Sequence, residues 1–191
     1  GYWLKHLNED CSDIYQIEGN FVGNVNYDLH EGSNLISYPY SAPLSIHELE
    51  YLCSEGILSQ VIGQGVALNC INSNYYGSLN DFMPSYGYWL TVNQDFNFTY
   101  PEPSVDDLSR QVAQLPKVPL EFSYNQSMKQ AFYFVEDVVL KDGSITKEDW
   151  LIAYHNETVI GARRWNGEYT DIPAMGSDDN EYSLTYATSG S

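Results

Sequence analysis

The feature that most constrains the fold is a succession of short stretches in which apolar and polar residues alternate, each ended by turn residues. In one of them, Tyr88, Leu90 and Val92 alternate with Trp89 and Thr91, which is the pattern of a strand with one buried face. The chain also has 17 Tyr and 4 Trp, and aromatic residues favour strands over helices. We therefore predict an all-β fold in the main, with one or two short helices.

One helix is expected to interrupt the strands of the first half. Ser45 and Glu48 have the spacing of a capping box, Leu49 and Leu52 form an apolar stripe, and Gly56 ends the pattern. The stretch 59–71 follows as a predicted hairpin of two short strands.

Prolines divide the chain into two small, β-sandwich-like modules. Pro101 and Pro103 end the first run of strands, and Pro116 and Pro119 precede the second. A short helix that begins at Ser104 is expected in between. The predicted boundaries are 1–103 for the first module, 104–117 for the linker and 118–191 for the second module.

The second module is predicted to contain four strands and an acidic loop. A long aromatic strand is expected over residues 129–140, and a hairpin over residues 149–155 and 158–165 turns at Asn156. The acidic stretch 172–186 is expected to be a loop that leads to a last strand.

Charge excludes several kinds of partner. The chain has 8 Lys and Arg against 26 Asp and Glu, a net charge of −18, which repels nucleic acid and anionic membranes. It has no apolar run of about 18 residues, so we expect no membrane insertion.

Cysteine spacing suggests one disulfide. Cys53 and Cys70 flank a compact apolar stretch, and a bridge between them would stabilise the fold by roughly 3 kcal/mol. Cys11 is then left over. The alternative is that all three cysteines are buried thiols.

No catalytic motif supports an enzyme. The four histidines, His6, His30, His47 and His155, do not form H-E-x-x-H, and no G-x-S-x-G is present. Paired carboxylates are frequent, as in any acidic chain, so a glycosidase is the weakest of the hypotheses. We predict a protein that is not an enzyme.

Two groups of residues are candidate sites. Asp178, Asp179 and Glu181 offer hard oxygen ligands in one loop, which suits calcium; a solvated loop without metal is the alternative, and no other cofactor is expected. Trp165 and Tyr169 lie where a strand enters a polar turn, so they could stack against a sugar, although packing in the core is the alternative.

Arg163 and Arg164 are rare positive charges in this acidic chain. We expect each of them to pair with a nearby carboxylate.

The stretch "LHEGSNLISYP" followed by "GYWLTV" resembles a module of large secreted and surface-attached bacterial proteins. Its usual form is an apolar strand, G-W-N-L-I-S-x-P and a closing G-Y-W strand, and Ser33 stands here where Trp is usual. The family often occurs in tandem, so "GYWLK" at residues 1–5 resembles the closing strand of a preceding module.

The second half resembles a partner β-sandwich of the same proteins, in which an Asp-Trp strand and a Gly-Ala-Arg strand form a hairpin. Ile160 stands where a Cys is often found. The relatives continue with further strands, so this sandwich is expected to be truncated. The matching residues are Asp149, Trp150, Ala153, Tyr154, Gly161, Ala162 and Arg163.

These resemblances imply a non-enzymatic structural or adhesive module of an extracellular or cell-surface protein. Its expected partners are copies of itself, neighbouring modules of the same protein and surface glycans. In a sharper version of this hypothesis, subunits polymerise by sharing strands at open sheet edges. The alternative function is a carbohydrate-binding module.

Overall fold

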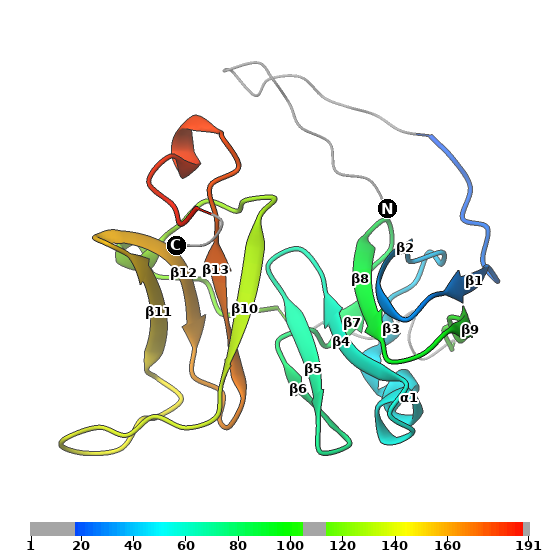
Figure 1. Ribbon diagram of the computed structural model, residues 1–191, viewed down its shortest axis with the longest axis horizontal. Coiled ribbons are helices and arrows are strands. Elements are labelled where there is room, and N and C mark those ends of the chain that lie inside the picture. The colour runs from blue at the N-terminus through cyan, green and yellow to red at the C-terminus, as the bar shows by residue number, and fades with distance from the viewer. Residues whose placement is uncertain (1–17, 105–113, 189–191) are drawn as a thin grey trace.

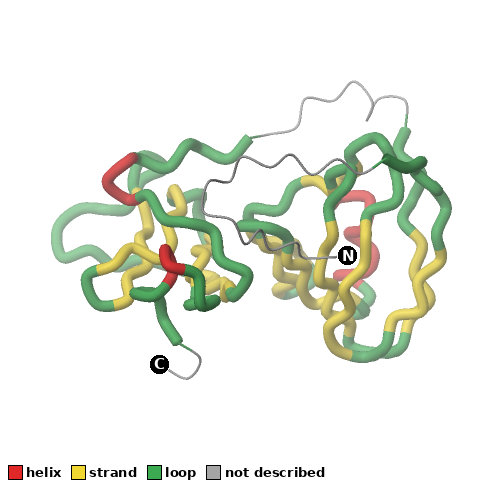
Figure 2. Tube along the Cα trace, turned by 90° about the horizontal axis from the view of Figure 1, so that it is seen from above, coloured by secondary structure: helices red, strands yellow, loops and turns green. Residues whose placement is uncertain are grey.

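The computed structural model describes residues 18–104 and 114–188, and its strands fall into two groups that lie side by side (Figures 1 and 2). We call the group β1 to β9 the N-terminal module and the group β10 to β13 the C-terminal module. The mainly β fold with small sheets and short helices is as predicted. The predicted strand at residues 1–5, Cys11 and most of the predicted linker helix lie outside the described residues.

The N-terminal module is built around an antiparallel five-stranded sheet. Its strands, in spatial order, are β2 (Gly32–Ser37), β8 (Gly87–Val92), β4 (Leu58–Ile62), β5 (Ala67–Ile71) and β6 (Asn74–Gly77). Two further antiparallel pairs join β1 (Asn26–Leu29) to β9 (Phe96–Thr99) and β3 (Leu44–Ser45) to β7 (Asp81–Phe82).

The alternation predicted for the strand β8 is confirmed. Tyr88 and Leu90 are 2% and 0% exposed, whereas Trp89 is 38% exposed. The buried face packs against an aromatic cluster in which the Phe82 ring lies edge-on to the rings of Tyr88 and Tyr100, at 4.9 and 5.0 Å between centroids. Edge-to-face packing suits the ring quadrupoles, so this cluster is a well-ordered core.

The predicted helix is present as a 3-10 turn, η1 (Ile46–Leu49), which continues into α1 (Glu50–Ser54). Ser45 caps it, because its hydroxyl accepts a hydrogen bond from the His47 N–H at 3.3 Å. The predicted disulfide is also present: Cys53 of α1 is bonded to Cys70 of β5, with 5.6 Å between Cα atoms, and so attaches the helix to the sheet.

The C-terminal module consists of two antiparallel strand pairs. The pairs are β11 (Trp150–His155) with β12 (Thr158–Arg164), the predicted hairpin, and β10 (Gln130–Val135) with β13 (Thr170–Met175). Short 3-10 turns, η2 (Leu120–Phe122) and η3 (Glu181–Ser183), flank them. Ile160, Met175 and Tyr186 form a core much smaller than that of the N-terminal module.

The strands β12 and β13 lie side by side (Figure 1) and come very close at one glycine. A Cβ on Gly161 would lie 1.6 Å from the Pro173 carbonyl oxygen, so only glycine fits there.

Two predictions for the C-terminal module are wrong in extent. The strand expected over residues 129–140 ends at Val135, because its partner strand begins at Thr170 and the ladder ends with that pair. The stretch 172–186, expected to be a loop, begins inside the strand β13 (Thr170–Met175), which pairs with β10. The paired residues include Pro173, although proline has no N–H to donate to a β-ladder. In the described residues that follow β13, 176–188, the structure has only η3 and a bridge between Gly176 and Ala187.

Candidate functional site: the junction of the two modules

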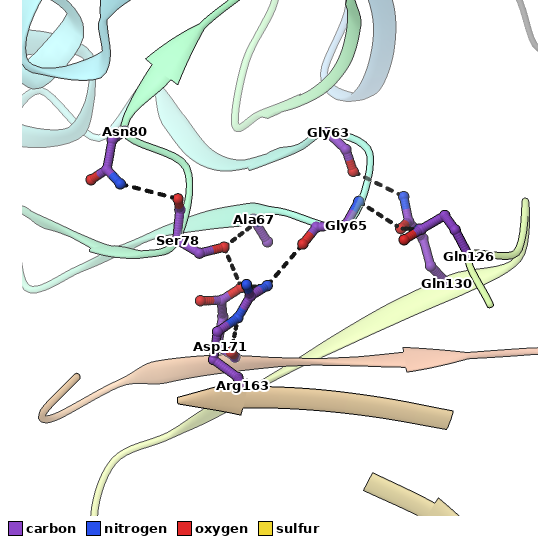
Figure 3. Close-up of polar contacts among 9 residues, drawn as sticks. All are labelled: Gly63, Gly65, Ala67, Ser78, Asn80, Gln126, Gln130, Arg163 and Asp171. Atoms are coloured by element: carbon purple, nitrogen blue, oxygen red, sulfur yellow. Dashed lines mark hydrogen bonds and ion pairs between the residues drawn. The ribbon is translucent and has the colours of Figure 1, made fainter. Parts of the chain in front are cut away.

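The two modules meet where β12 and β13 approach the loop between β4 and β5 (Figure 3). Arg163 of β12 donates from Nη2 to the Gly65 carbonyl oxygen at 2.8 Å. Ser78, which follows β6, donates from its hydroxyl to the Asp171 carboxylate of β13 at 2.7 Å. One side chain of each strand therefore contacts the other module.

Arg163 and Asp171 also bind each other. The guanidinium Nη2 lies 3.2 Å from the carboxylate, and Nε donates to the Asp171 carbonyl oxygen at 3.0 Å. The two side chains are only 9% and 2% exposed. Burial raises the pKa of Asp171 to about 6, although Arg163 and the Ser78 hydroxyl favour the ionised form.

The side chain of Gln130 forms a second set of hydrogen bonds across the junction. Its amide donates to the Gly63 carbonyl oxygen at 3.0 Å, and its oxygen accepts from the Gly65 N–H at 3.3 Å and from Gln126 at 2.8 Å. Gly65 has φ +68°. A side chain there would be strained and would also meet Gln126 at 2.9 Å.

We call the residues that bond across the junction the module clamp. Its members are Gly63, Gly65, Ser78, Gln130, Arg163 and Asp171. Because the partners of Arg163 and Asp171 lie 98 and 93 residues away in the sequence, no local pattern reveals them. The only sequence signal for these contacts was the presence of two adjacent arginines in an acidic chain. As predicted, each forms an ion pair with a carboxylate: Arg163 with Asp171 and Arg164 with Glu148.

A cleft of about 770 Å³ opens beside the clamp, between β6 and the β12–β13 turn. Four aromatic side chains line it: Tyr75, Tyr76, Trp165 and Tyr169. Its polar lining includes the side chains of Asn80, Lys147, Glu148, Arg164, Asn166 and Glu168.

Both predicted ligand-binding residues lie in this cleft. Trp165 is largely buried, at 9% exposed, and its backbone N–H donates to the Asp149 carbonyl oxygen at 2.9 Å. Tyr169 is half-buried, and the centroid of its ring lies 4.8 Å from the ring centroid of Tyr76 in the other module. Its hydroxyl donates to Glu136 at 3.0 Å, and this hydrogen bond raises the pKa of Tyr169.

The backbone of Tyr169 has φ 57°, in the left-handed region. This conformation is unusual for a bulky side chain and is stable only where the surroundings impose it. The turn between β12 and β13 therefore holds the Tyr169 ring in the cleft, against Tyr76.

The predicted calcium ligands lie apart from the cleft, and only one of them is buried. Asp178 accepts hydrogen bonds from the Ser183 hydroxyl at 2.7 Å, the Met128 N–H at 3.2 Å and the Tyr182 hydroxyl at 3.2 Å. Burial opposes its ionisation, but hydrogen bonds from Ser183, Met128 and Asn180 hold the pKa of Asp178 well below its usual range. Asp179 and Glu181 are exposed, so the structure gives Asp178 an internal role.

Within residues 18–104 and 114–188, no group of three or more His, Cys, Asp or Glu side chains is placed to hold a metal ion. In the same residues, no helix is long and apolar enough to cross a membrane. No protein-family model matches the chain, and no curated protein or solved structure is significantly similar to it.

Proposed function

We propose that this chain is a non-enzymatic structural and adhesive unit of an extracellular or cell-surface protein. The observation that carries the proposal is the module clamp. Hydrogen bonds from Arg163 and Gln130 to the N-terminal module, and from Ser78 to Asp171, tie the modules together. Two of them involve the Arg163–Asp171 ion pair, which is buried within the C-terminal module, and removing one partner of that pair leaves a buried charge uncompensated. This arrangement suits a unit that keeps its shape while neighbours pull on it.

The carboxylates with strongly shifted pKa values favour a structural role over a catalytic one. Asp171 is bonded to Arg163 and Ser78, and Asp178 to Ser183 and Tyr182. Catalytic acids and bases also have shifted pKa values, but they must reach a substrate. Here internal partners occupy both carboxylates.

The disulfide between Cys53 and Cys70 supports an extracellular location, because disulfides persist in oxidising compartments. The net charge of −18 favours solubility at a surface.

Strand sharing between subunits stays a proposal, and the C-terminal module supplies its support. Among the described residues, β10 pairs only with β13 and β11 only with β12, so each has one edge without a paired strand. Tyr133 on β10 and Tyr154 on β11 are 63% and 56% exposed. Negative-stain microscopy over a range of concentrations tests it: filaments are expected, and dispersed single particles throughout would contradict it.

The experiment that tests the structural unit is differential scanning calorimetry of the full chain. If the clamp makes the modules one cooperative body, we expect a single transition whose calorimetric and van't Hoff enthalpies agree. The double variant Ser78→Ala, Gln130→Leu removes inter-module hydrogen bonds and should split this transition in two.

A matched control is Ser59→Ala. The Ser59 hydroxyl also donates one hydrogen bond, to the Thr91 carbonyl oxygen at 3.0 Å, but within the N-terminal module. This variant should lower the transition temperature without splitting the transition. Two transitions in the unaltered chain would overturn the proposed unit.

A further inference from the structure

We propose that the cleft between the modules binds a segment of an uncharged glycan chain. The proposal rests on the adhesive part of the proposed function and names the ligand class. The cleft, about 770 Å³, falls within the range of roughly 300–1,000 Å³ that is usual for ligand sites, which often lie between domains.

The aromatic lining is the first argument. Tyr76 and Tyr169, both half-buried, line the cleft and meet at 4.8 Å between ring centroids with their planes inclined by 60°, whereas Trp165, at 9% exposed, is too buried to stack against a sugar. Aromatic faces are apolar while the Tyr edge carries a polar group, which matches the C–H faces and hydroxyl edges of a sugar ring.

The backbone of Tyr169 is the second, independent argument. A φ of 57° is strained for tyrosine, and strained residues cluster at ligand sites. Glycine would form this turn without strain. The chain instead has a tyrosine there, with its hydroxyl bonded to Glu136, and the ring is positioned in the cleft.

The polar lining is the third argument. Asn80 and Asn166 are exposed at the cleft, and Glu148 and Glu168 are exposed beside them. Amides donate and accept, and carboxylates accept, so together they can satisfy the hydroxyl groups of a sugar.

Charge selects an uncharged ligand. The cleft has three positive side chains, of Lys147, Arg163 and Arg164, and three acidic ones, of Glu148, Glu168 and Asp171. In a chain with a net charge of −18 this cleft is locally balanced. A polyanion would be repelled by the rest of the surface, and a polycation would find more favourable acidic surface elsewhere.

The test is isothermal titration calorimetry of the full chain with four uncharged hexasaccharides, of β-1,4-glucose, β-1,3-glucose, β-1,4-N-acetylglucosamine and β-1,4-mannose. Hexagalacturonate is the anionic comparison. We expect at least one uncharged hexasaccharide to bind with a Kd below about 1 mM, and more tightly than hexagalacturonate.

Tyr169→Gly is the deciding variant, because glycine accepts the left-handed backbone while the ring and its hydroxyl are removed. It should weaken binding about tenfold. Tyr133→Ala, which removes an exposed ring outside the cleft, should leave the affinity unchanged. Asn166→Ala should also weaken binding, which tests the polar lining separately.

The inference is overturned if no uncharged hexasaccharide binds, if hexagalacturonate binds best, or if Tyr169→Gly binds as well as the unaltered chain. Calorimetric unfolding of the same samples separates this result from the proposed function. A single unfolding transition without glycan binding overturns the glycan inference alone, whereas two transitions overturn the structural unit.

Discussion

Arg163 and Asp171 lie 3.2 Å apart on neighbouring strands of the C-terminal module, both nearly inaccessible to solvent, and each also bonds to the N-terminal module. The ion pair therefore belongs to the fold of one module and to its junction with the other. Two predictions concern this ion pair, two concern other contacts of the C-terminal module, and a fifth concerns the disulfide.

Arg163→Met should lower the free energy of unfolding by about 3–5 kcal/mol, because it leaves the Asp171 carboxylate buried without its counter-ion. Arg164→Met should cost less than about 1 kcal/mol, since Arg164 is 33% exposed and its partner Glu148 is 84% exposed. Urea titrations of both variants give the comparison. Equal losses would show that burial of the first pair does not matter.

The contribution of Asp171 to the free energy of unfolding should increase as the pH falls from about 7 toward 4. Its pKa is about 6 in the folded chain and 3.8 ordinarily, so the folded state holds the proton more tightly. At about 1.4 kcal/mol per pKa unit, the contribution approaches about 3 kcal/mol.

The measurement is the difference in free energy of unfolding between the unaltered chain and Asp171→Asn across this pH range. The variant cannot titrate at this position, so the other acids cancel in the difference. A difference that is flat, or that grows with rising pH, would refute the assignment.

Gly161→Ala should destabilise the C-terminal module by about 3 kcal/mol or more, because a methyl group would overlap the Pro173 carbonyl and push β12 away from β13. Gly19→Ala, at a position with open space around it, should change stability by less than about 0.5 kcal/mol. Thermal unfolding monitored by near-UV circular dichroism compares the two. Similar behaviour of both variants would mean that the strands separate easily.

Asp178→Ala should lower the free energy of unfolding by about 2–3 kcal/mol, since it leaves the donors of Ser183, Met128 and Tyr182 unpaired. Glu181→Ala, at an exposed position, should have little effect. Because internal donors occupy the Asp178 carboxylate, calcium should not raise the Tm of the unaltered chain. A Tm that rises with calcium in the unaltered chain, but not in Asp178→Ala, would instead establish the calcium site.

The double variant Cys53→Ser, Cys70→Ser should lose about 3 kcal/mol, because the unfolded chain regains the freedom that the disulfide removes. Dithiothreitol should destabilise the unaltered chain by a similar amount and leave the double variant unaffected. If the reductant has no effect on either, the two cysteines are unpaired thiols in solution.

The features that the sequence predicted correctly are those formed by residues close together along the chain. The alternation of Tyr88 and Leu90 with Trp89 defined the buried face of β8, and the Asn156 turn placed the hairpin of β11 and β12. Ser45 predicted the start of the helix, since a capping hydroxyl acts within one turn. Such patterns are readable because strand pleat and helix capping are local.

What the sequence did not show depends on partners that the chain brings together only when folded. The strand β10 ends at Val135 because β13 begins at Thr170, and β13 went unrecognised because Pro173 is unfavourable in a strand. Local residues do not reveal the length of a ladder.

The candidate site divides in the same way. The sequence by itself determined the strands with a clear alternation, such as β8, the hairpin turn at Asn156, the capped helix, the disulfide spacing, and Trp165 and Tyr169 as aromatic residues at a polar turn. Only the tertiary structure decided that Tyr169 meets Tyr76, and that Arg163 reaches Gly65 across 98 residues of sequence. The physical reason is that a buried hydrogen bond and an aromatic contact between the modules form only where two surfaces exclude water together, and those surfaces exist only once both modules have folded.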